Sequence, residues 1–313
     1  MCTFGILTMT LTFDAMSLSE DESEYIDLVR DRAMRQIDCN VWEGIQRNRL
    51  TGWLGSLRNI EAELLGAYLL DNLCYRSRGQ YSAMLDALFL DLFMPSSTKS
   101  TLLVDAMRGK KAGNPSGGVC LAPVIGHLAP PTKSGPYILR LVQRRFLLHS
   151  DWLVWPHLLG QASGVTDLYF VDDFCGTGDQ FDKFLKGIHF DRFLQANPKV
   201  NVTYLVTTIH TKGRDRIVKN YPYVQLKWAE LLEDSHAVLD SSCLARYQVN
   251  SFAEKITSQY TQAVKSLGLP QVGKFAEGFG ELGLAYAFAH ATPNNTLPIF
   301  WMGTQNLTPL LDR

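Results

Sequence analysis

Apolar positions repeat with helical spacing in the first third of the chain and gather in short strand-like runs after that. From residue 19 to residue 95, apolar side chains recur every three or four positions, the spacing of an amphipathic helix that buries one face. After residue 95, runs rich in β-branched and aromatic residues alternate with helical segments. This alternation is typical of a parallel sheet covered by helices, so it predicts an α/β fold. We expect a helical region over residues 1–95 and an α/β domain over residues 96–313.

The expected elements are bounded by capping and breaking residues. Ser19 and Glu22 form a capping-box pattern that begins the first helix, and Pro95 ends the last helix of the helical region. Further helices are expected near residues 60, 81, 181 and 252, and strands over residues 102–104, 119–125, 168–171, 202–209 and 223–227. Short apolar runs of this kind are typical of strands in the interior of a parallel sheet.

One stretch, residues 168–180, has the composition of a ligand-binding strand end. Four apolar residues are followed at once by Asp172 and Asp173, then by a turn with Gly176 and Gly178, and then by an amphipathic helical run. In an open α/β sheet, such loops lie at the carboxyl ends of the strands, where ligands bind. The alternative is a purely structural strand end, in which an Asx-type turn caps the helix.

The residue types in this stretch suit a ligand that carries both a sugar and a phosphate. Glycines allow backbone N–H groups to approach a phosphate, and the N-terminus of the following helix adds a favourable dipole. Thr177 can add a hydroxyl donor. Asp172 and Asp173 would repel a phosphate, but they can accept hydrogen bonds from vicinal sugar hydroxyls or bind a hydrated Mg²⁺ ion. A ribose with a 5′-phosphate satisfies both halves of the motif.

The same stretch resembles a known family. Residues 171–178, Val-Asp-Asp-Phe-Cys-Gly-Thr-Gly, are similar to the motif of type I phosphoribosyltransferases that binds phosphoribosyl pyrophosphate (PRPP). Together with residues 292–301, the longer string over residues 168–180 resembles the phosphoribosyltransferase-like proteins of bacterial conflict systems, the PRTase-CE group. Some members of this group are effectors encoded beside retron reverse transcriptases. The likeness extends from about Trp42 to Trp301, and it implies a type I phosphoribosyltransferase-like, Rossmann-like parallel sheet.

The resemblance assigns roles to individual residues. It implies that Asp172 and Asp173 are the catalytic acids, which hold the ribose hydroxyls and, through the ligand or water if not directly, Mg²⁺. The loop that would hold the 5′-phosphate comprises Cys175, Gly176, Thr177, Gly178 and Asp179. Its cysteine is expected to pack rather than to act as a nucleophile, since no histidine lies near it in the sequence. Asp179 and Gln180 replace the Gly-Thr ending of biosynthetic members, so the loop carries extra negative charge.

Two further segments are expected at the ligand site. Lys133, Ser134 and Gly135 resemble the loop that grips pyrophosphate in type I phosphoribosyltransferases; the alternative is a surface linker. The tail resembles the hood that covers the active site and selects the base, although it could equally form the last strand of the sheet. Asn294 and Asn295 could read the edge of a base or close a turn.

Composition and charge narrow the class of protein. A chain of 313 residues, 46% of them hydrophobic and 19% charged, can bury a substantial core. The net charge of −1 argues against a general nucleic-acid coat, but residues 1–95 carry a net charge of −6 and residues 96–168 a net charge of +5, which suits an anionic ligand beside the motif. The six cysteines show neither close pairs nor zinc spacing, so we expect a reduced, cytoplasmic protein. No apolar run approaches the roughly 20 residues of a membrane-spanning helix, and no membrane partner is expected.

The resemblance leaves three functions open. The first is an effector enzyme that binds PRPP or a nucleotide with Mg²⁺ and acts as the toxic arm of an antiphage, retron-type defence system. The second is a catalytically inactive nucleotide-binding sensor on the same fold. The third is an assembly subunit whose helical region docks on a reverse transcriptase and its msDNA. In each case we expect the protein to be oligomeric or part of a complex.

Overall fold

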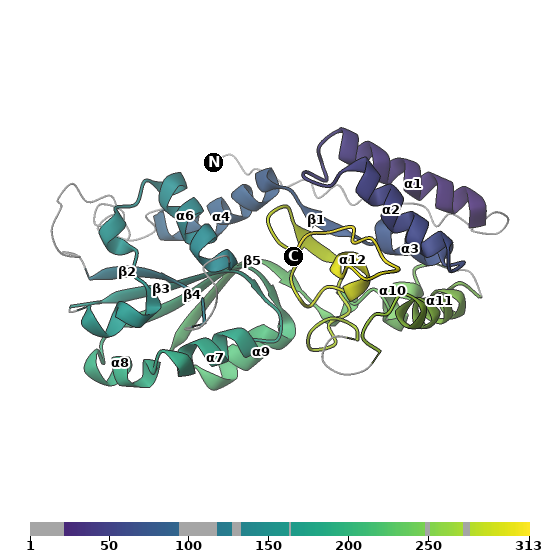
Figure 1. The fold of residues 1–313 in the computed structure, drawn as a ribbon. Coiled ribbons are helices and arrows are strands. Elements are labelled where there is room, and N and C mark those ends of the chain that lie inside the picture. The colour runs from purple at the N-terminus through teal and green to yellow at the C-terminus, as the bar shows by residue number, and fades with distance from the viewer. Residues whose placement is uncertain (1–21, 94–117, 127–132, 163, 248–250, 272–275) are drawn as a thin grey trace, which may run out of the picture.

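The chain forms two lobes (Figure 1). The computed structural model describes residues 22–93, 118–126, 133–162, 164–247, 251–271 and 276–313. One lobe is a parallel sheet flanked by helices, and the other is a cluster of helices beside it. The strand expected at residues 102–104 and the N-terminal residues 1–18 lie outside the described residues.

Four parallel strands form the sheet of the first lobe. They are β2 (Val119–Pro123), β3 (Asp167–Cys175), β4 (Asn201–His210) and β5 (Val224–Leu232), paired in that order. Most residues of β3 and β4 are buried because helices cover both faces, which accounts for their nearly continuous apolar sequence. The predicted α/β fold with a parallel sheet is confirmed.

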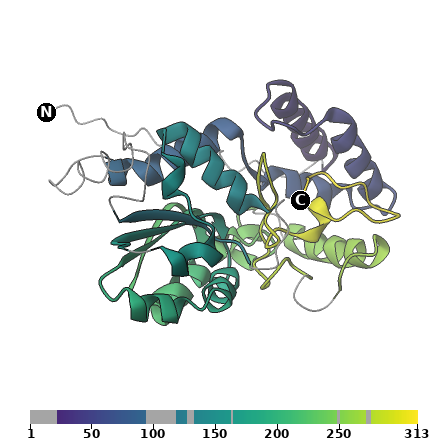
Figure 2. The ribbon, with the colours of Figure 1, turned by 60° about the vertical axis from the view of Figure 1, so that its left-hand side comes forward.

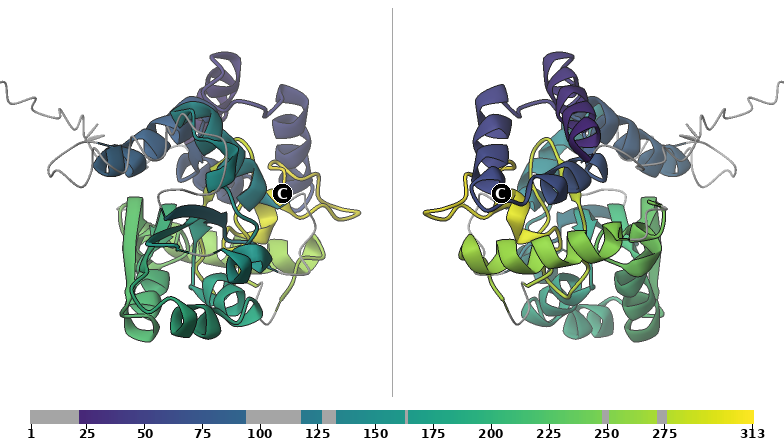
Figure 3. Two further views of the ribbon diagram at one scale, coloured as in Figure 1. Left: turned by 90° about the vertical axis from the view of Figure 1, so that its left-hand side faces the viewer. Right: turned by 90° about the vertical axis from the view of Figure 1, so that its right-hand side faces the viewer.

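Helices cover both faces of this sheet (Figure 3). One face packs against α4 (Arg78–Phe93) and α6 (Ser134–Phe146), and the other packs against α7 (Asp179–Gly187), α8 (Phe190–Ala196) and α9 (Thr211–Asn220). On the second face, the Phe170 ring of β3 meets Phe184 and Phe190 edge-on, at centroid distances of 5.1 and 5.3 Å. Each face of the sheet packs into its own hydrophobic core. Successive residues of β3 point alternately into one core and the other.

Residues from both ends of the chain build the second lobe (Figure 2). Its helices are α1 (Glu22–Asp38), α2 (Arg47–Arg58), α3 (Glu63–Asp71), α10 (Ser241–Leu244), α11 (Phe252–Ser266) and α12 (Pro298–Trp301). One core joins them: Trp53 stacks on Phe300 at 5.8 Å and donates a hydrogen bond to the Ile299 carbonyl at 2.8 Å. The helices expected within residues 1–95 are thus divided, since α1 to α3 lie in the helical lobe and α4 packs on the sheet.

A two-stranded sheet connects the lobes. β1 (Cys74–Arg76) pairs in parallel with β6 (Tyr286–Phe288). Arg76 forms an ion pair with Glu230 of β5, and the Tyr286 hydroxyl donates a hydrogen bond to the same carboxylate at 2.7 Å. This network ties the C-terminal segment to the main sheet.

Three short 3-10 helices complete the described elements: η1 (Ser150–Trp152), η2 (Pro156–Gln161) and η3 (Asp234–His236). Within the described ranges, no helix is both long enough and apolar enough to cross a membrane.

Candidate functional site

The two acidic residues near the end of β3 have adjoining carboxyl groups, but their other partners differ. Asp172 is 1% exposed and accepts hydrogen bonds from the Tyr204 hydroxyl at 2.9 Å and from the Asp173 backbone N–H at 3.0 Å. Tyr204 in turn stacks on Phe181 of α7 at 4.2 Å, which ties Asp172 to the α7 side of the sheet.

Asp173 lies where three separate segments meet. One carboxylate oxygen accepts a hydrogen bond from the Ser134 hydroxyl at 3.0 Å, and the other lies 3.3 Å from Nε2 of His290. Ser134 is the first residue of α6, and His290 follows β6 in the C-terminal segment. The fold thus brings two hydrogen-bond donors from distant parts of the chain to one carboxylate.

The two carboxyl groups differ in charge. Burial, together with the negative charge of Asp173, raises the pKa of Asp172 well above its usual range. Burial alone would raise the pKa of Asp173 as well, but the hydrogen bond and charge of His290 bring it below its ordinary value. The pKa of Asp172 is thus displaced upward and that of Asp173 downward, and the ionised Asp173 can only accept hydrogen bonds at neutral pH.

The glycine turn after β3 is held by close backbone packing. Gly178, the N-cap of α7, has a φ of +76°, a conformation that favours glycine. The Asp179 backbone N–H donates a hydrogen bond to the Thr177 hydroxyl oxygen at 3.4 Å. A Cβ atom at Gly213, near the start of α9, would lie only 2.5 Å from the Gly176 carbonyl oxygen. These contacts fix the backbone of the loop at the N-terminus of α7, where a phosphate is favoured.

The Cys175 side chain is buried, and the Asp179 side chain forms ion pairs within the protein. Burial raises the pKa of the Cys175 thiol to about 12, so the thiol stays protonated at neutral pH. Asp179 forms ion pairs with Lys183 at 2.6 Å and with Arg216 at 3.4 Å. These cations offset the negative charge that Asp179 adds beside the N-terminus of α7.

The C-terminal segment over residues 276–296 lies against the loop. A Cβ atom at Gly176 would lie 2.4 Å from the side-chain oxygen of Asn295. Asn295 is buried, and its amide donates a hydrogen bond to the Phe279 carbonyl at 2.6 Å. Of the two asparagines that the sequence singles out, Asn295 therefore contacts the loop directly, whereas Asn294 accepts a hydrogen bond from the Phe279 N–H through its backbone carbonyl.

The segment Lys133–Gly135 lies at the same edge of the sheet. Its serine bonds to Asp173, and its glycine packs on the end of β2, where a Cβ atom would lie 3.2 Å from the Val124 carbonyl oxygen. Its lysine is exposed at the N-cap of α6. The structure therefore gathers Asp173, this segment, the glycine loop and Asn295, while Asp172 adjoins Asp173 and is also bonded to Tyr204. The ligand-binding roles expected for these residues stay predictions.

Sequence patterns do not single out two residues of the site, His290 and Tyr81. The His290 ring stacks on Phe288 at 5.0 Å, and the Tyr81 ring meets it edge-on at 4.6 Å. Tyr137 of α6 contacts the same imidazole at 5.4 Å and is 40% exposed. Both residues lie in apolar stretches that read as core segments, and only the tertiary packing of α4 and β6 brings them to Asp173.

The donor set limits how a metal ion could bind. The described residues contain no group of three or more histidine, cysteine, aspartate or glutamate side chains that could hold a metal ion. Mg²⁺ prefers six oxygen ligands and retains several waters. The Asp173 carboxylate therefore fits an ion that binds together with a phosphate ligand, which would supply further oxygens.

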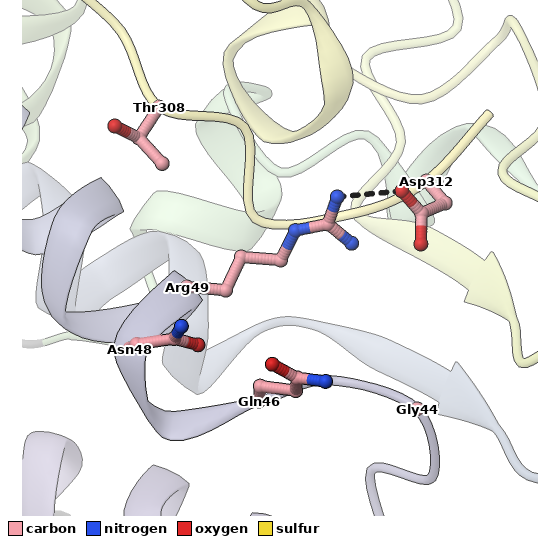
Figure 4. Close-up of a pocket in the computed structure, with 6 residues that line it drawn as sticks. All are labelled: Gly44, Gln46, Asn48, Arg49, Thr308 and Asp312. Atoms are coloured by element: carbon pink, nitrogen blue, oxygen red, sulfur yellow. Dashed lines mark hydrogen bonds and ion pairs between the residues drawn. The ribbon is translucent and has the colours of Figure 1, made fainter.

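A separate cavity lies in the helical lobe (Figure 4). It has a volume of about 450 Å³ and is lined by Gly44, Gln46, Asn48, Arg49, Thr308 and Asp312. Arg49 pairs with Asp312 at 2.6 Å. None of these residues belongs to the strand end, loop or helix that form the site at β3.

Comparison with known proteins identifies a family and a distantly similar solved structure. A family model described as PRTase-CE matches residues 50–313, a range that includes every residue of the site at β3. Among solved structures, the chain is similar to orotate phosphoribosyltransferase from Aeropyrum pernix, at 17% sequence identity, over 49% of this chain and 72% of that chain, with a TM-score of 0.29. No match was found among curated proteins.

Proposed function

The chain belongs to the PRTase-CE family, and on this premise we propose that it binds a ribose 5-phosphate ligand, either PRPP or a nucleotide, at the carboxyl end of β3. Family membership and the parallel α/β fold make it a phosphoribosyltransferase-like protein. The proposal is carried by the juxtaposition of an ionised Asp173 with the glycine loop at the N-terminus of α7. The carboxylate accepts hydrogen bonds from sugar hydroxyls, and the loop offers backbone N–H groups to a phosphate.

In this proposal, different residues bind different parts of the ligand. Asp173 binds the sugar, and the loop from Gly176 to Gly178 binds the 5′-phosphate. Lys133, exposed at the N-cap of α6, supplies positive charge for the pyrophosphate of PRPP. Asp172 is a positioning residue, because its hydrogen bond with Tyr204 fixes the end of the strand.

With PRPP as substrate, the reaction is a displacement at the sugar C1. The bond from C1 to the pyrophosphate oxygen breaks, pyrophosphate leaves with that electron pair, and a nucleophilic atom of the acceptor forms the new bond. Asp173 stabilises positive charge that develops on the sugar, and Lys133 stabilises the departing pyrophosphate. Mg²⁺, when bound with the ligand, would neutralise further negative charge there.

The proposal extends to a biological role as the toxic effector of an antiphage, retron-type defence system in the cytoplasm. It is supported by the resemblance of residues 168–180 and 292–301 to conflict-system members of the family. A reverse transcriptase with its msDNA is the partner that such a role implies.

One observation favours a second candidate, a sensor that binds without turnover. The C-terminal segment packs on the glycine loop closely enough that a Cβ atom at Gly280 would lie 2.3 Å from the Thr177 methyl carbon. A phosphate on that side of the loop would require the segment to shift. Such a shift would couple ligand binding to a change in the protein's surface, which is sufficient for signalling.

Calorimetric titration tests the proposal. PRPP, ribose 5-phosphate and a panel of nucleoside phosphates are titrated into the wild type and into Asp173→Asn, in the presence of Mg²⁺. The variant lacks the ionised acceptor, and hydrogen bonds to charged groups contribute about 1.5–3 kcal/mol, so we expect its affinity to fall at least about tenfold.

Asp167→Asn is the matched control, because Asp167 lies at the opposite end of the same strand, and it should bind the ligand like the wild type. Equal affinities of Asp173→Asn and the wild type would contradict the proposed site. Release of pyrophosphate from PRPP in the presence of candidate acceptors then separates an enzyme from a sensor.

A further inference from the structure

A groove runs along α11 on the surface of the helical lobe. It has a volume of about 950 Å³, and its accessible lining is mainly apolar. Figure 1 shows α10 and α11 next to each other, below α3. The segment at α10 lines the groove with Leu239, Leu244 and Ala245, and α11 lines it with one of its exposed sides. An apolar groove on a protein surface marks an interaction site more often than a scattered exposed side chain does.

The two sides of α11 differ in composition. One side is buried in the core of the helical lobe and carries Phe252, Ile256, Tyr260, Ala263 and Val264. The other side is exposed, and it lines the groove with residues spaced three or four positions apart. We call these six residues the α11 face: Glu254, Thr257, Ser258, Thr261, Gln262 and Lys265.

Charge is distributed along the α11 face in a regular way. Glu254 lies in the first turn of the helix and Lys265 in the last turn, and the residues between them on this face are uncharged. The two charged residues are eleven positions apart, which is about three turns or roughly 16 Å along the axis. They therefore share one side of the helix but are too far apart to pair with each other. Within the described part of the chain, neither forms an ion pair.

We propose that the α11 face docks against the α11 face of a second copy of this chain, with the two helices antiparallel about a two-fold axis. In this arrangement Glu254 meets Lys265 of the partner subunit, and the symmetry repeats that ion pair at the other end. A parallel arrangement would instead place like charges opposite each other. The charge pattern of the face is thus complementary to itself in one orientation only.

The shape of the surface agrees with this partner. The middle of the α11 face carries the small side chains of Thr257, Ser258 and Thr261, so a second helix can approach closely. Its side chains pack into the groove between α10 and α11, in the manner of ridges packing into grooves. Because α11 belongs to the helical lobe, this dimer leaves the site at β3 accessible. The inference goes beyond the proposed function and does not depend on which ligand binds there.

Sedimentation velocity over a range of concentrations of the ligand-free protein tests the inference. An interface of one helix and its groove lies at the low end of interface sizes, so we expect dimers with a dissociation constant of roughly micromolar order. Lys265→Glu places two carboxylates opposite each other at both ends, and Glu254→Lys does the same with two ammonium groups. Each variant should raise the dissociation constant at least about tenfold.

Mixing these two variants gives the sharpest result. One chain then carries lysine at both ends of the α11 face and the other carries glutamate at both ends, so the mixture should form heterodimers about as tightly as the wild type dimerises. Ser258→Arg is a further variant, which leaves the charges at the helix ends in place. It lies near the two-fold axis, so it should also prevent dimerisation, by bringing two guanidinium groups together.

Lys219→Glu is the matched control, because it makes the same change in the last turn of α9, in the sheet lobe, and should dimerise like the wild type. All the substituted side chains are exposed, so the melting temperatures of the monomers should stay close to the wild-type value.

Three results would overturn the inference. A wild type that stays monomeric at high concentration would leave Glu254 and Lys265 with a role in the helix dipole alone. Dimerisation of Lys265→Glu with the wild-type dissociation constant would place the interface elsewhere. A mixture that associates no better than its components would show that the two charges do not meet across the contact. None of these results bears on ligand binding at β3, so the proposed function is tested separately.

Discussion

Near the end of β3, the pKa of one carboxyl group is raised and that of its neighbour is lowered, and the cause lies in their surroundings. Asp172 is buried with only the Tyr204 hydroxyl and one backbone N–H as donors. The Asp173 carboxylate is contacted by the Ser134 hydroxyl and by Nε2 of His290, which favour its charged form. The resemblance assigns the ribose to both carboxyl groups, but Ser134 and His290 contact only Asp173. The sequence does not reveal this difference between the two, because Ser134 and His290 come from distant segments.

The raised pKa of Asp172 should make stability depend on pH. Its pKa is raised in the folded state, so the unfolded chain releases this proton first, and the free energy of unfolding falls as the pH rises above about 4. Asp172→Asn removes this titration. We expect the variant to gain stability relative to the wild type between about pH 4 and the raised pKa, by up to about 1.4 kcal/mol per pH unit. Urea unfolding over a pH series measures the difference, and a difference that is constant with pH would contradict a raised pKa of Asp172.

The unit from β3 through the glycine loop to α7 is the part of the site that the sequence predicts best. Its signals are local: an apolar run, adjacent acidic residues, a glycine at positive φ and an amphipathic helix. The contacts that hold the loop are not local, since Gly213 belongs to α9 and Asn295 to the C-terminal segment. Sequence patterns identify the type of each element, but not which distant residue packs on it. The loop's geometry therefore depends on residues outside the motif.

Gly213→Ala, a substitution in the neighbouring helix α9, should disturb the packing of the glycine loop. Alanine normally favours a helix over glycine by about 1 kcal/mol, but here the added methyl group would lie 2.5 Å from the Gly176 carbonyl oxygen and 2.9 Å from the Cys175 sulfur. We expect a net loss of about 1–3 kcal/mol in the free energy of unfolding and weaker binding of ribose 5-phosphate. Urea unfolding and calorimetry measure the two effects.

Gly187→Ala, at the end of α7, is the control for this substitution, since a Cβ atom there meets nothing within 4 Å. It should leave stability and affinity close to wild type. If the two variants behaved alike, the close approach of α9 to the loop would not be a constraint on the site.

The whole molecule is organised by contacts between residues far apart in the sequence. The core of the helical lobe combines residues 25–75 with residues 238–311, so its two halves flank the sheet lobe in sequence. The domain boundary expected at residue 95 follows the change in hydrophobic spacing along the chain. Hydrophobic spacing does not indicate which distant segment completes a given core. Between the lobes, the Arg76–Glu230 ion pair and the β1–β6 pairing hold the C-terminal segment over the site.

Breaking the Arg76–Glu230 pair should loosen the junction of the lobes. The side chains are 26% and 21% exposed, so either single variant, Arg76→Met or Glu230→Gln, leaves a largely buried polar group without its partner. We expect each to lower the free energy of unfolding by about 2–4 kcal/mol. The double variant should cost less than the sum of the two, because no uncompensated charge remains. Urea unfolding of the four proteins gives the coupling energy.

The Arg47–Asp38 pair is the matched surface control, with side chains 63% and 41% exposed. Arg47→Met should leave the free energy of unfolding close to the wild-type value, because water screens an exposed ion pair. Strict additivity at Arg76 and Glu230 would show that the pair does not couple the lobes.

The shared core of the helical lobe also determines when this lobe can fold during translation. Helices α1 to α3 emerge early, yet their apolar faces are covered by residues 238–311, which follow the sheet lobe in the sequence. At about 5–20 residues per second, these helices wait roughly 10–50 s for their partners. His290 and Asn295 likewise follow every strand of the main sheet in the sequence. A chain cut short by premature termination therefore lacks the residues that complete both this lobe and the site, so truncated products would be inactive targets for chaperones and proteases.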